Sequence, residues 1–153
     1  EVKHRSLSDL SIVDVRVFNY FSHTQNIDTR FLITDIVRAI KNKEVFKTSV
    51  DNIVRDFITP PDFYNLIQAI IDAKSTNIAL DCYTKNPVSK FDLLSELKNK
   101  FGLIYDFDEN INTIDATGAK VNYYSTNKIS GNIKYMPDNT SLDGIIQEMN
   151  CVL

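Results

Sequence analysis

Arg55 is the side chain in this sequence that is best suited to anion-binding chemistry. It lies in a short extended run directly before a Pro-Pro helix start. A planar guanidinium donates a fork of hydrogen bonds that matches a phosphate or a carboxylate. The commoner arrangement for such a residue is a surface ion pair, here with Asp51 or Asp56, which contributes little to stability. The residues alone leave both interpretations open.

Asn19 and His23 are the next candidates. Asn19 ends a hydrophobic extended run, which is where α/β sheets present residues to ligands, although asparagine is also common in ordinary turns. His23 follows in a polar loop, and the other histidine, His4, lies in the N-terminal tail. Because the histidines are isolated and the cysteines number only two, we expect no zinc site and no other resident metal.

Lys120, Tyr123 and Tyr124 have the composition of a catalytic Tyr–Lys pair but not its order. In such a pair the lysine follows the tyrosine by one helical turn, so that the ammonium lowers the tyrosine pKa. Here the lysine comes first, in a segment that reads as extended. We expect these tyrosines to pack or to line a groove, because aromatic faces suit a sugar or base ring. The sequence therefore predicts no catalytic residue in this chain.

Length and composition exclude several classes of protein. The 153 residues, of which 43% are hydrophobic and 24% charged, suit one globular domain. A net charge of −3 argues against nucleic acid as a partner, and no apolar run is long enough for a membrane span. The four glycines are isolated, so the sequence contains neither a dinucleotide-binding fingerprint nor a P-loop. With two cysteines and no export leader, we expect a cytoplasmic location.

Strands and helices are both needed to position these side chains. β-branched and aromatic runs predict strands at residues 11–21, 44–50, 53–58, 77–83, 103–107 and 121–125. Apolar residues at helical spacing predict helices near 32–40, 60–74, 90–101 and 142–149, and a short helical turn is expected near 125–130. The segment 108–120 reads as polar and irregular.

Several turn and cap residues are expected to mark the boundaries of these elements. Asp51-Asn52 predicts a two-residue hairpin turn. Side-chain caps are expected at Asp28 or Thr29, at Thr59 with Asp62, at Ser89 with Asp92, and at Ser141, with Gly102 ending a helix.

The order of the elements favours an α+β fold, or half of a larger α/β sheet. The strands at 11–21 and 77–83 have no hairpin partners, so we expect them at the edge of a sheet whose other strands lie elsewhere. Because the chain also begins without methionine, we expect it to be a piece of a longer protein.

Four stretches carry a family resemblance. Arg16-Val17-Phe18-Asn19-Tyr20 is similar to an R-x-F-N-x-Y motif, and residues 54–62 are similar to R-D-F-hydrophobic-H-V-x-D. Pro87-Val88-Ser89 precedes a Leu-rich helix, and residues 133–142 read as an aromatic-x-proline, serine-leucine ending. In this order and spacing, over nearly the whole chain, they resemble the extended short-chain dehydrogenases/reductases, the NAD-dependent sugar-nucleotide epimerases and dehydratases.

The resemblance implies that residues 1–153 are the C-terminal, substrate-binding part of such an enzyme of carbohydrate biosynthesis. The fold implied is α/β (α+β as an isolated piece): the last strands of a Rossmann-type sheet plus a small mixed substrate-binding domain. The missing N-terminal Rossmann half is implied to carry the Gly-rich cofactor loop and the catalytic Tyr-x-x-x-Lys. NAD or NADP is implied for the full-length parent and no cofactor for this chain alone, which we expect to be inactive.

The resemblance also assigns expected roles to single residues. Asn19 is implied to contact the cofactor and the sugar nucleotide, Arg55 to bind the diphosphate of a nucleoside-diphosphate sugar, and Asp62 to anchor a helix start. Ser22-His23 stands where the family has glycine-proline, and Thr59-Pro60-Pro61 replaces its His-Val, so sugar specificity does not transfer.

Two alternatives remain open from the sequence. In the first alternative, the chain is a non-catalytic nucleotide-sugar-binding or protein-interaction module on the same scaffold. In the second, it is an unrelated α+β domain. On the leading interpretation, strands without their sheet partners expose apolar surface along residues 11–21 and 77–83, so we expect self-association.

Overall fold

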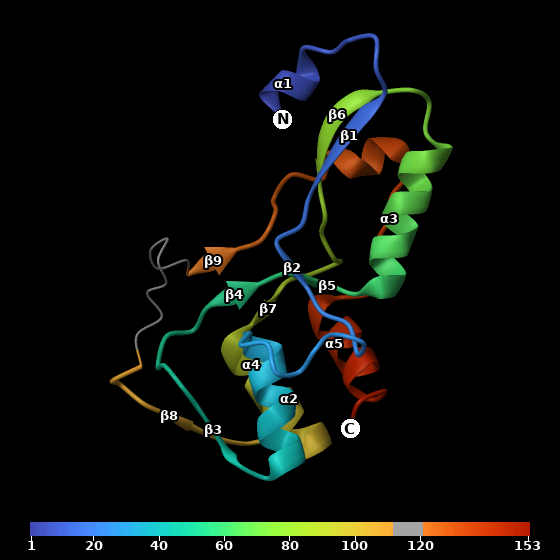
Figure 1. Cartoon of the computed structure of the whole chain (residues 1–153). Helices are drawn as coiled ribbons and strands as arrows, with labels where there is room; N and C mark the ends of the chain where they lie inside the picture. The colour runs from blue at the N-terminus through green and yellow to red at the C-terminus, as the bar shows by residue number, and fades with distance from the viewer. Residues whose placement is uncertain (112–120) are drawn as a thin grey trace.

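A computed structural model describes residues 1–111 and 121–153 of the chain (Figure 1). In chain order the elements are α1 (Val2–Arg5), β1 (Ile12–Arg16), β2 (Asn19–Tyr20), α2 (Leu32–Asn42), β3 (Val45–Thr48), β4 (Val54–Arg55), β5 (Phe57–Ile58), α3 (Pro60–Asp72), β6 (Asn77–Asp81), β7 (Val88–Ser89), α4 (Lys90–Phe101), β8 (Ile104–Phe107), β9 (Asn122–Tyr123), the 3₁₀ helix η1 (Ile129–Ile133) and α5 (Ser141–Met149). The mixture of helices with small, mostly parallel sheets confirms the expected α/β class.

The expected strand at 11–21 is divided into two strands that pair with different partners. β1 runs parallel to β6, with Val15 opposite Leu80, whereas β2 runs parallel to β5, with Asn19 opposite Phe57. Val17, which lies between the two strands, belongs to neither and is exposed. The chain therefore leaves one sheet and joins another immediately before Asn19.

The prediction of a hairpin at Asp51-Asn52 is wrong, because β3 and β4 do not pair with each other. β3 pairs in parallel with β8, while β4 lies between β7 and β9. The Asn52 side chain accepts a hydrogen bond from the backbone N–H of Phe91, so it caps the first turn of α4 instead of turning a hairpin. The physical reason is that α2 and α4 bury their apolar faces in one cluster, and this brings the strands that follow each helix side by side.

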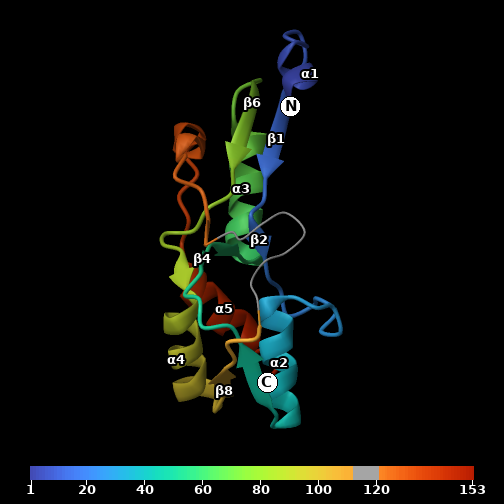
Figure 2. The ribbon, with the colours of Figure 1, turned by 90° about the vertical axis from the view of Figure 1, so that its left-hand side faces the viewer.

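Two apolar clusters divide the molecule into two lobes, which lie at opposite ends of Figures 1 and 2. One lobe contains α3, β1, β6 and η1, and its cluster is built on Ile58, Leu66, Cys82, Tyr83 and Tyr135. The other contains α2, α4, α5, β3 and β8, and its fully buried residues include Ile36, Leu94, Leu97, Ile145 and Met149.

The helix boundaries follow the predictions more closely than the caps do. Ser89 accepts from the Asp92 N–H as expected, and Gly102 ends α4 at a φ of +69°. The cap of α2 is Phe31, not Asp28 or Thr29, and the cap of α5 is Thr140, not Ser141. In α5 the Thr140 hydroxyl accepts from the Asp143 N–H, so the cap lies one residue earlier than expected.

Thr59 occupies the N-cap position of α3, but its side chain makes no capping hydrogen bond. The capping box expected with Asp62 is therefore wrong. Among the described residues, no helix combines the length and apolarity that a membrane crossing requires.

Candidate functional site

A cavity of about 610 Å³ opens where the chain passes from β1 to β2. It lies at the carboxyl end of β1, the end of a parallel sheet at which α/β folds bind ligands. Its lining residues come from β2, the loop before α2, and the β4–β5 segment. They are Val17, Phe18, Asn19, Tyr20, Gln25, Arg30, Phe31, Leu32, Ile53, Arg55 and Phe57.

Asn19 is held in this cavity by its backbone and by its side chain. The backbone lies in β2 opposite Phe57, and Nδ2 donates to the carbonyl of Asp56 at 3.1 Å. The side chain is half-buried. The amide is thus fixed in direction by β5, so it is a pre-oriented polar group in the wall of the cavity.

Arg55 lines the same cavity from β4. Its Nη1 donates to the backbone carbonyls of Val54 at 2.9 Å and Val121 at 3.2 Å, and its Cζ lies 5.9 Å from the centre of the Tyr123 ring. These contacts hold the guanidinium against the β4–β9 pair, in the wall of the cavity.

Asp56, one of the two acids considered as a surface partner of Arg55, is buried and serves a different purpose. Its carboxylate accepts from the Thr84 hydroxyl at 2.5 Å, the Thr84 N–H at 3.1 Å and the Ser141 hydroxyl at 2.7 Å. It thereby joins the start of α5 to the segment after β6.

Sequence reasoning missed Arg30 and Gln25. Both come from the loop between β2 and α2, and Arg30 brings a second guanidinium to the cavity. No signal in the sequence marks Arg30, because it lies in a polar loop whose path depends on tertiary contacts. Among the described lining residues there is no aspartate or glutamate, so the cavity favours an anion.

Aromatic side chains form much of the remaining wall. Phe18, Tyr20, Phe31 and Phe57 line the cavity, and Phe18 contacts Tyr123 edge-to-face with ring centres 5.1 Å apart. Such faces can pack against a sugar or a base. Tyr123 is therefore a packing residue beside the site. Lys120, which was considered with it as a Tyr–Lys pair, lies outside the described residues.

His23 and Asp62 do not line the cavity. The His23 ring and backbone both contact Glu148 of α5. Asp62 is fully buried, and its carboxylate accepts from the backbone N–H groups of Asp138 at 2.7 Å and Asn139 at 3.1 Å. Asp62 thus ties the first turn of α3 to the segment before α5.

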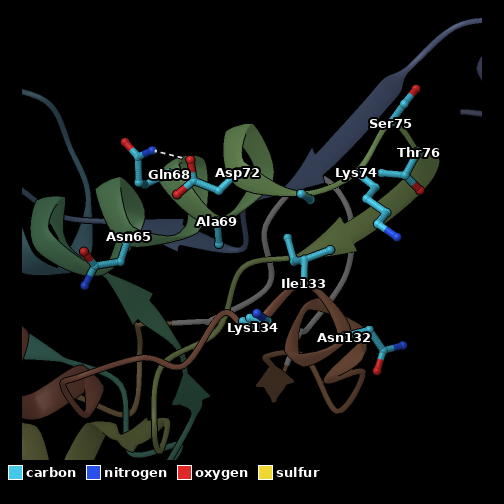
Figure 3. Close-up of a pocket in the computed structure, with 11 residues that line it drawn as sticks. Asn65, Gln68, Ala69, Asp72, Lys74, Ser75, Thr76, Asn132, Ile133 and Lys134 are labelled. Atoms are coloured by element: carbon cyan, nitrogen blue, oxygen red, sulfur yellow. Dashed lines mark hydrogen bonds between the residues drawn. The ribbon is translucent and has the colours of Figure 1, made fainter.

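A larger cavity of about 900 Å³ lies between α3, the start of β6 and η1 (Figure 3). Its walls mix amides with both signs of charge, and Gln68 donates to Asp72 at 3.0 Å. It sits at the amino end of β6, opposite to the end at which parallel sheets bind ligands. For that reason the smaller cavity is the candidate site.

Within the described residues, no group of three or more His, Cys, Asp or Glu side chains is arranged to hold a metal ion. The site's chemistry as described rests on guanidinium, amide and aromatic groups.

No protein-family model and no curated protein sequence matches this chain. Solved structures do match it. The UDP-glucuronic acid 4-epimerase of Bacillus cereus, in complex with UDP-glucuronic acid and NAD, aligns over 99% of this chain and 48% of its own, with a TM-score of 0.78 and 18% identity.

Two other enzymes show the same fold. The UDP-glucose 4-epimerase of Thermotoga maritima, with UDP-glucose, has a TM-score of 0.72 and 12% identity over 90% of this chain and 43% of its own. The dTDP-glucose 4,6-dehydratase of Bacillus anthracis, in complex with NAD, has a TM-score of 0.72 and 13% identity over 90% of this chain and 43% of its own. The present chain thus spans less than half of each of these three chains and has the fold of that part, which confirms the fold expected from the sequence.

Proposed function

We propose that the chain binds the nucleoside-diphosphate group of a nucleotide sugar in the cavity between β2, the loop before α2, and β4. On this proposal it is the substrate-binding portion of an NAD(P)-dependent nucleotide-sugar epimerase, dehydratase or reductase. The observation that carries the proposal is the presence of Arg30 and Arg55 on two different walls, with no carboxylate among the described lining residues.

The proposed contacts follow from the chemistry of each lining group. Arg30 and Arg55 bind the diphosphate oxygens, for which guanidinium groups are well matched. Asn19 donates or accepts at the junction between the nucleotide sugar and the cofactor, because it stands at the carboxyl end of β1. The aromatic faces pack against the base or the sugar ring. Binding the non-reacting diphosphate in this way would orient the sugar for reaction.

The described part of the chain does not by itself fit a dinucleotide cofactor. Dinucleotide phosphates are held by clustered glycines at a helix N-terminus. The described glycines are isolated: Gly102 follows α4, Gly131 lies in η1, and Gly144 lies inside α5. We therefore assign the cofactor, which would supply the hydride chemistry, to the N-terminal half and derive no catalytic step from this chain.

The N-terminal half is the partner expected at β1. In the described structure β1 pairs with β6 along one edge only, and a strand edge pairs readily with a further strand. The same cavity would serve the second candidate function, a non-catalytic binding module on the same scaffold, because none of the described lining residues is given a catalytic role. A longer reading frame that encodes a Gly-rich βαβ unit and Tyr-x-x-x-Lys would support the enzyme over the module.

Calorimetric titration of the chain with UDP, UMP, UDP-glucose and NAD tests the proposal. We expect UDP and UDP-glucose to bind about tenfold or more tightly than UMP, since the second phosphate gains charged hydrogen bonds. We expect no micromolar binding of NAD. Equal affinity for UMP and UDP, or no binding of any uridine nucleotide, would refute the diphosphate site.

A further inference from the structure

The loop that joins β2 to α2 brings Gln25 and Arg30 to the cavity, but it has little regular structure of its own. Its internal hydrogen bonds are short-range turns, from the Gln25 N–H to the Ser22 carbonyl at 3.0 Å and from the Thr29 N–H to the Asn26 carbonyl at 3.2 Å. Such turns set the local shape of the loop. They do not determine where it lies relative to Arg55, which stands on β4.

Beyond Phe21, whose N–H donates to the carbonyl of Ile58 at 3.1 Å, one external anchor of this loop is Glu148, near the end of α5. One carboxylate oxygen, Oε2, accepts from the backbone N–H of His23 at 2.8 Å and lies 2.7 Å from Nδ1 of the same residue. The Glu148 side chain is only 10% exposed, whereas the His23 ring is 44% exposed. The mostly buried carboxylate of Glu148 thus binds His23 and holds the first turn of the loop by charge-assisted hydrogen bonds.

The second anchor is Arg38, on α2. Its Nη1 donates to the carbonyl of Ile27 and to the carbonyl of Thr29 at 3.3 Å, while Nη2 pairs with Asp35. Ile27 itself packs against the apolar cluster of that lobe. The last part of the loop is therefore fixed immediately before Arg30.

We propose that Glu148 and Arg38 are positioning residues of the nucleotide-sugar site, which hold the β2–α2 loop so that Gln25 and Arg30 face Arg55. The inference rests on the proposed function. Neither Glu148 nor Arg38 lines the cavity, so each acts through the loop. The two anchors bracket Gln25, since one holds His23 and the other holds Ile27 and Thr29.

The proposal differs from a merely structural role in one measurable respect. If Glu148 acts by placing the loop that carries Arg30, its removal weakens nucleotide binding more when Arg30 is present than when it is absent. A double-mutant cycle between Glu148 and Arg30 measures this coupling. A structural role would instead lower affinity by the same factor in both backgrounds.

The experiment measures the UDP affinity of the whole chain by calorimetry and backbone hydrogen exchange in residues 22–31 by mass spectrometry. Glu148→Ala should weaken UDP binding about tenfold and accelerate exchange in the loop, because two charge-assisted hydrogen bonds are lost. Glu148→Gln keeps an acceptor oxygen, so it should restore most of the affinity. In an Arg30→Ala background, Glu148→Ala should cause a clearly smaller loss, because only Gln25 is then left for the loop to place. Arg38→Met should accelerate exchange at residues 27–31.

The matched control is Glu96→Ala, which removes a glutamate of α4 that lies 3.8 Å from Lys100 and far from the loop in sequence. His23→Ala removes only the exposed ring and serves as a second variant if Glu148→Ala does not fold. It should give a smaller loss of UDP affinity in the same direction.

Unchanged UDP affinity and unchanged loop exchange in both the Glu148 and His23 variants would overturn the proposal, as would strict additivity in the cycle. Failure of the proposed function is distinguishable, because the unmodified chain would then bind no UDP at all. In that case faster loop exchange in Glu148→Ala would still support the anchoring, and unchanged exchange would overturn it.

Discussion

Arg55 and Asp56 are neighbours in sequence whose hydrogen-bond partners give them different roles. Arg55 lines the cavity, whereas Asp56 is buried with Thr84 and Ser141. The strand alternation of adjacent residues separates their side chains onto opposite faces. At this scale, the role of a charged residue follows from its partners in space and not from its type.

Substitution of Arg55 tests its proposed role in binding the diphosphate. In the chain alone, Arg55→Ala should weaken nucleotide-sugar affinity by roughly 10- to 100-fold, the effect of losing charged hydrogen bonds. Arg55→Lys should recover only part, since a point charge lacks the guanidinium fork. Lys98→Ala, at the exposed end of α4, is the control. An unchanged dissociation constant for Arg55→Ala would contradict the assignment.

The two cysteines should differ in reactivity. The pKa of the Cys82 thiol is raised to about 12, mainly by burial and in smaller part by the negative charges of Asp81 and Asp56. Cys151 is exposed. Because the thiolate is the reactive form, we expect one fast-reacting thiol per native chain with a disulfide reagent at pH 8, and two after denaturation. Cys151→Ser should abolish the fast phase; a fast phase that survives would contradict the burial of Cys82.

The residue scale also shows what sequence could and could not predict about the site. Asn19 and Arg55 were identified because strand ends and motif spacing can be recognised along the chain. Arg30 and Glu148 could not be, because the path of the β2–α2 loop depends on tertiary contacts such as the Glu148–His23 pair, whose members are 125 positions apart. The binding roles of Asn19 and Arg55 stay predictions.

At the scale of elements, the first turns of α3 and α5 are interlocked. Asp62 of α3 binds the segment before α5, and Ser141 of α5 donates to Asp56 beside β5. Thr59 approaches Gly144 so closely that a Cβ there would stand 2.7 Å from its Oγ1. The close approach of Thr59 leaves no room for a side chain larger than hydrogen at position 144 of α5.

Gly144→Ala should therefore destabilise the chain, although alanine normally favours a helix by about 1 kcal/mol over glycine. Overpacking in a tight contact costs about 1–3 kcal/mol. Chemical denaturation should show a net loss, which Thr59→Ala should relieve because it removes the close atoms. Gly131→Ala is the control, since its nearest neighbour would be Tyr83 Oη at 3.9 Å. Increased stability of Gly144→Ala would show that the helices separate easily.

Local pattern predicted the helices well and the strand pairings poorly. Leu94 and Leu97, whose helical spacing helps to predict α4, are fully buried. The β3–β8 pair joins residues about 60 positions apart, and turn residues between neighbouring strands cannot predict a pairing over that distance. Ser141 was mistaken for a cap because serine suits that role, but its hydroxyl is used by Asp56.

At the scale of the whole molecule, the β1–β6 sheet has two strands and an open edge in the described structure. Exposed apolar residues accompany it, among them Leu7 and Leu10 before β1 and Val17 after it. The exposure expected along residues 77–83 is wrong, because Leu80 and Tyr83 are buried there. Open strand edges with apolar neighbours promote association between chains.

We therefore expect the chain to self-associate. Sedimentation velocity should show a weight-average sedimentation coefficient that rises with protein concentration. High salt should leave the effect in place, because apolar contacts and backbone hydrogen bonds are little screened. A strictly monomeric profile at high concentration would contradict this expectation.

The division between β1 and β2 has a consequence for any affinity measured on this chain. Asn19 lies three positions beyond the last residue of β1, so the wall of the cavity continues directly from this strand. The edge of β1 that faces away from β6 pairs with no described strand. Docking of a strand there would stiffen the backbone leading to Asn19 and reduce the ordering entropy that the ligand must otherwise overcome. If the proposed N-terminal half supplies that strand, the dissociation constant of the isolated chain is an upper bound on that of the assembled protein.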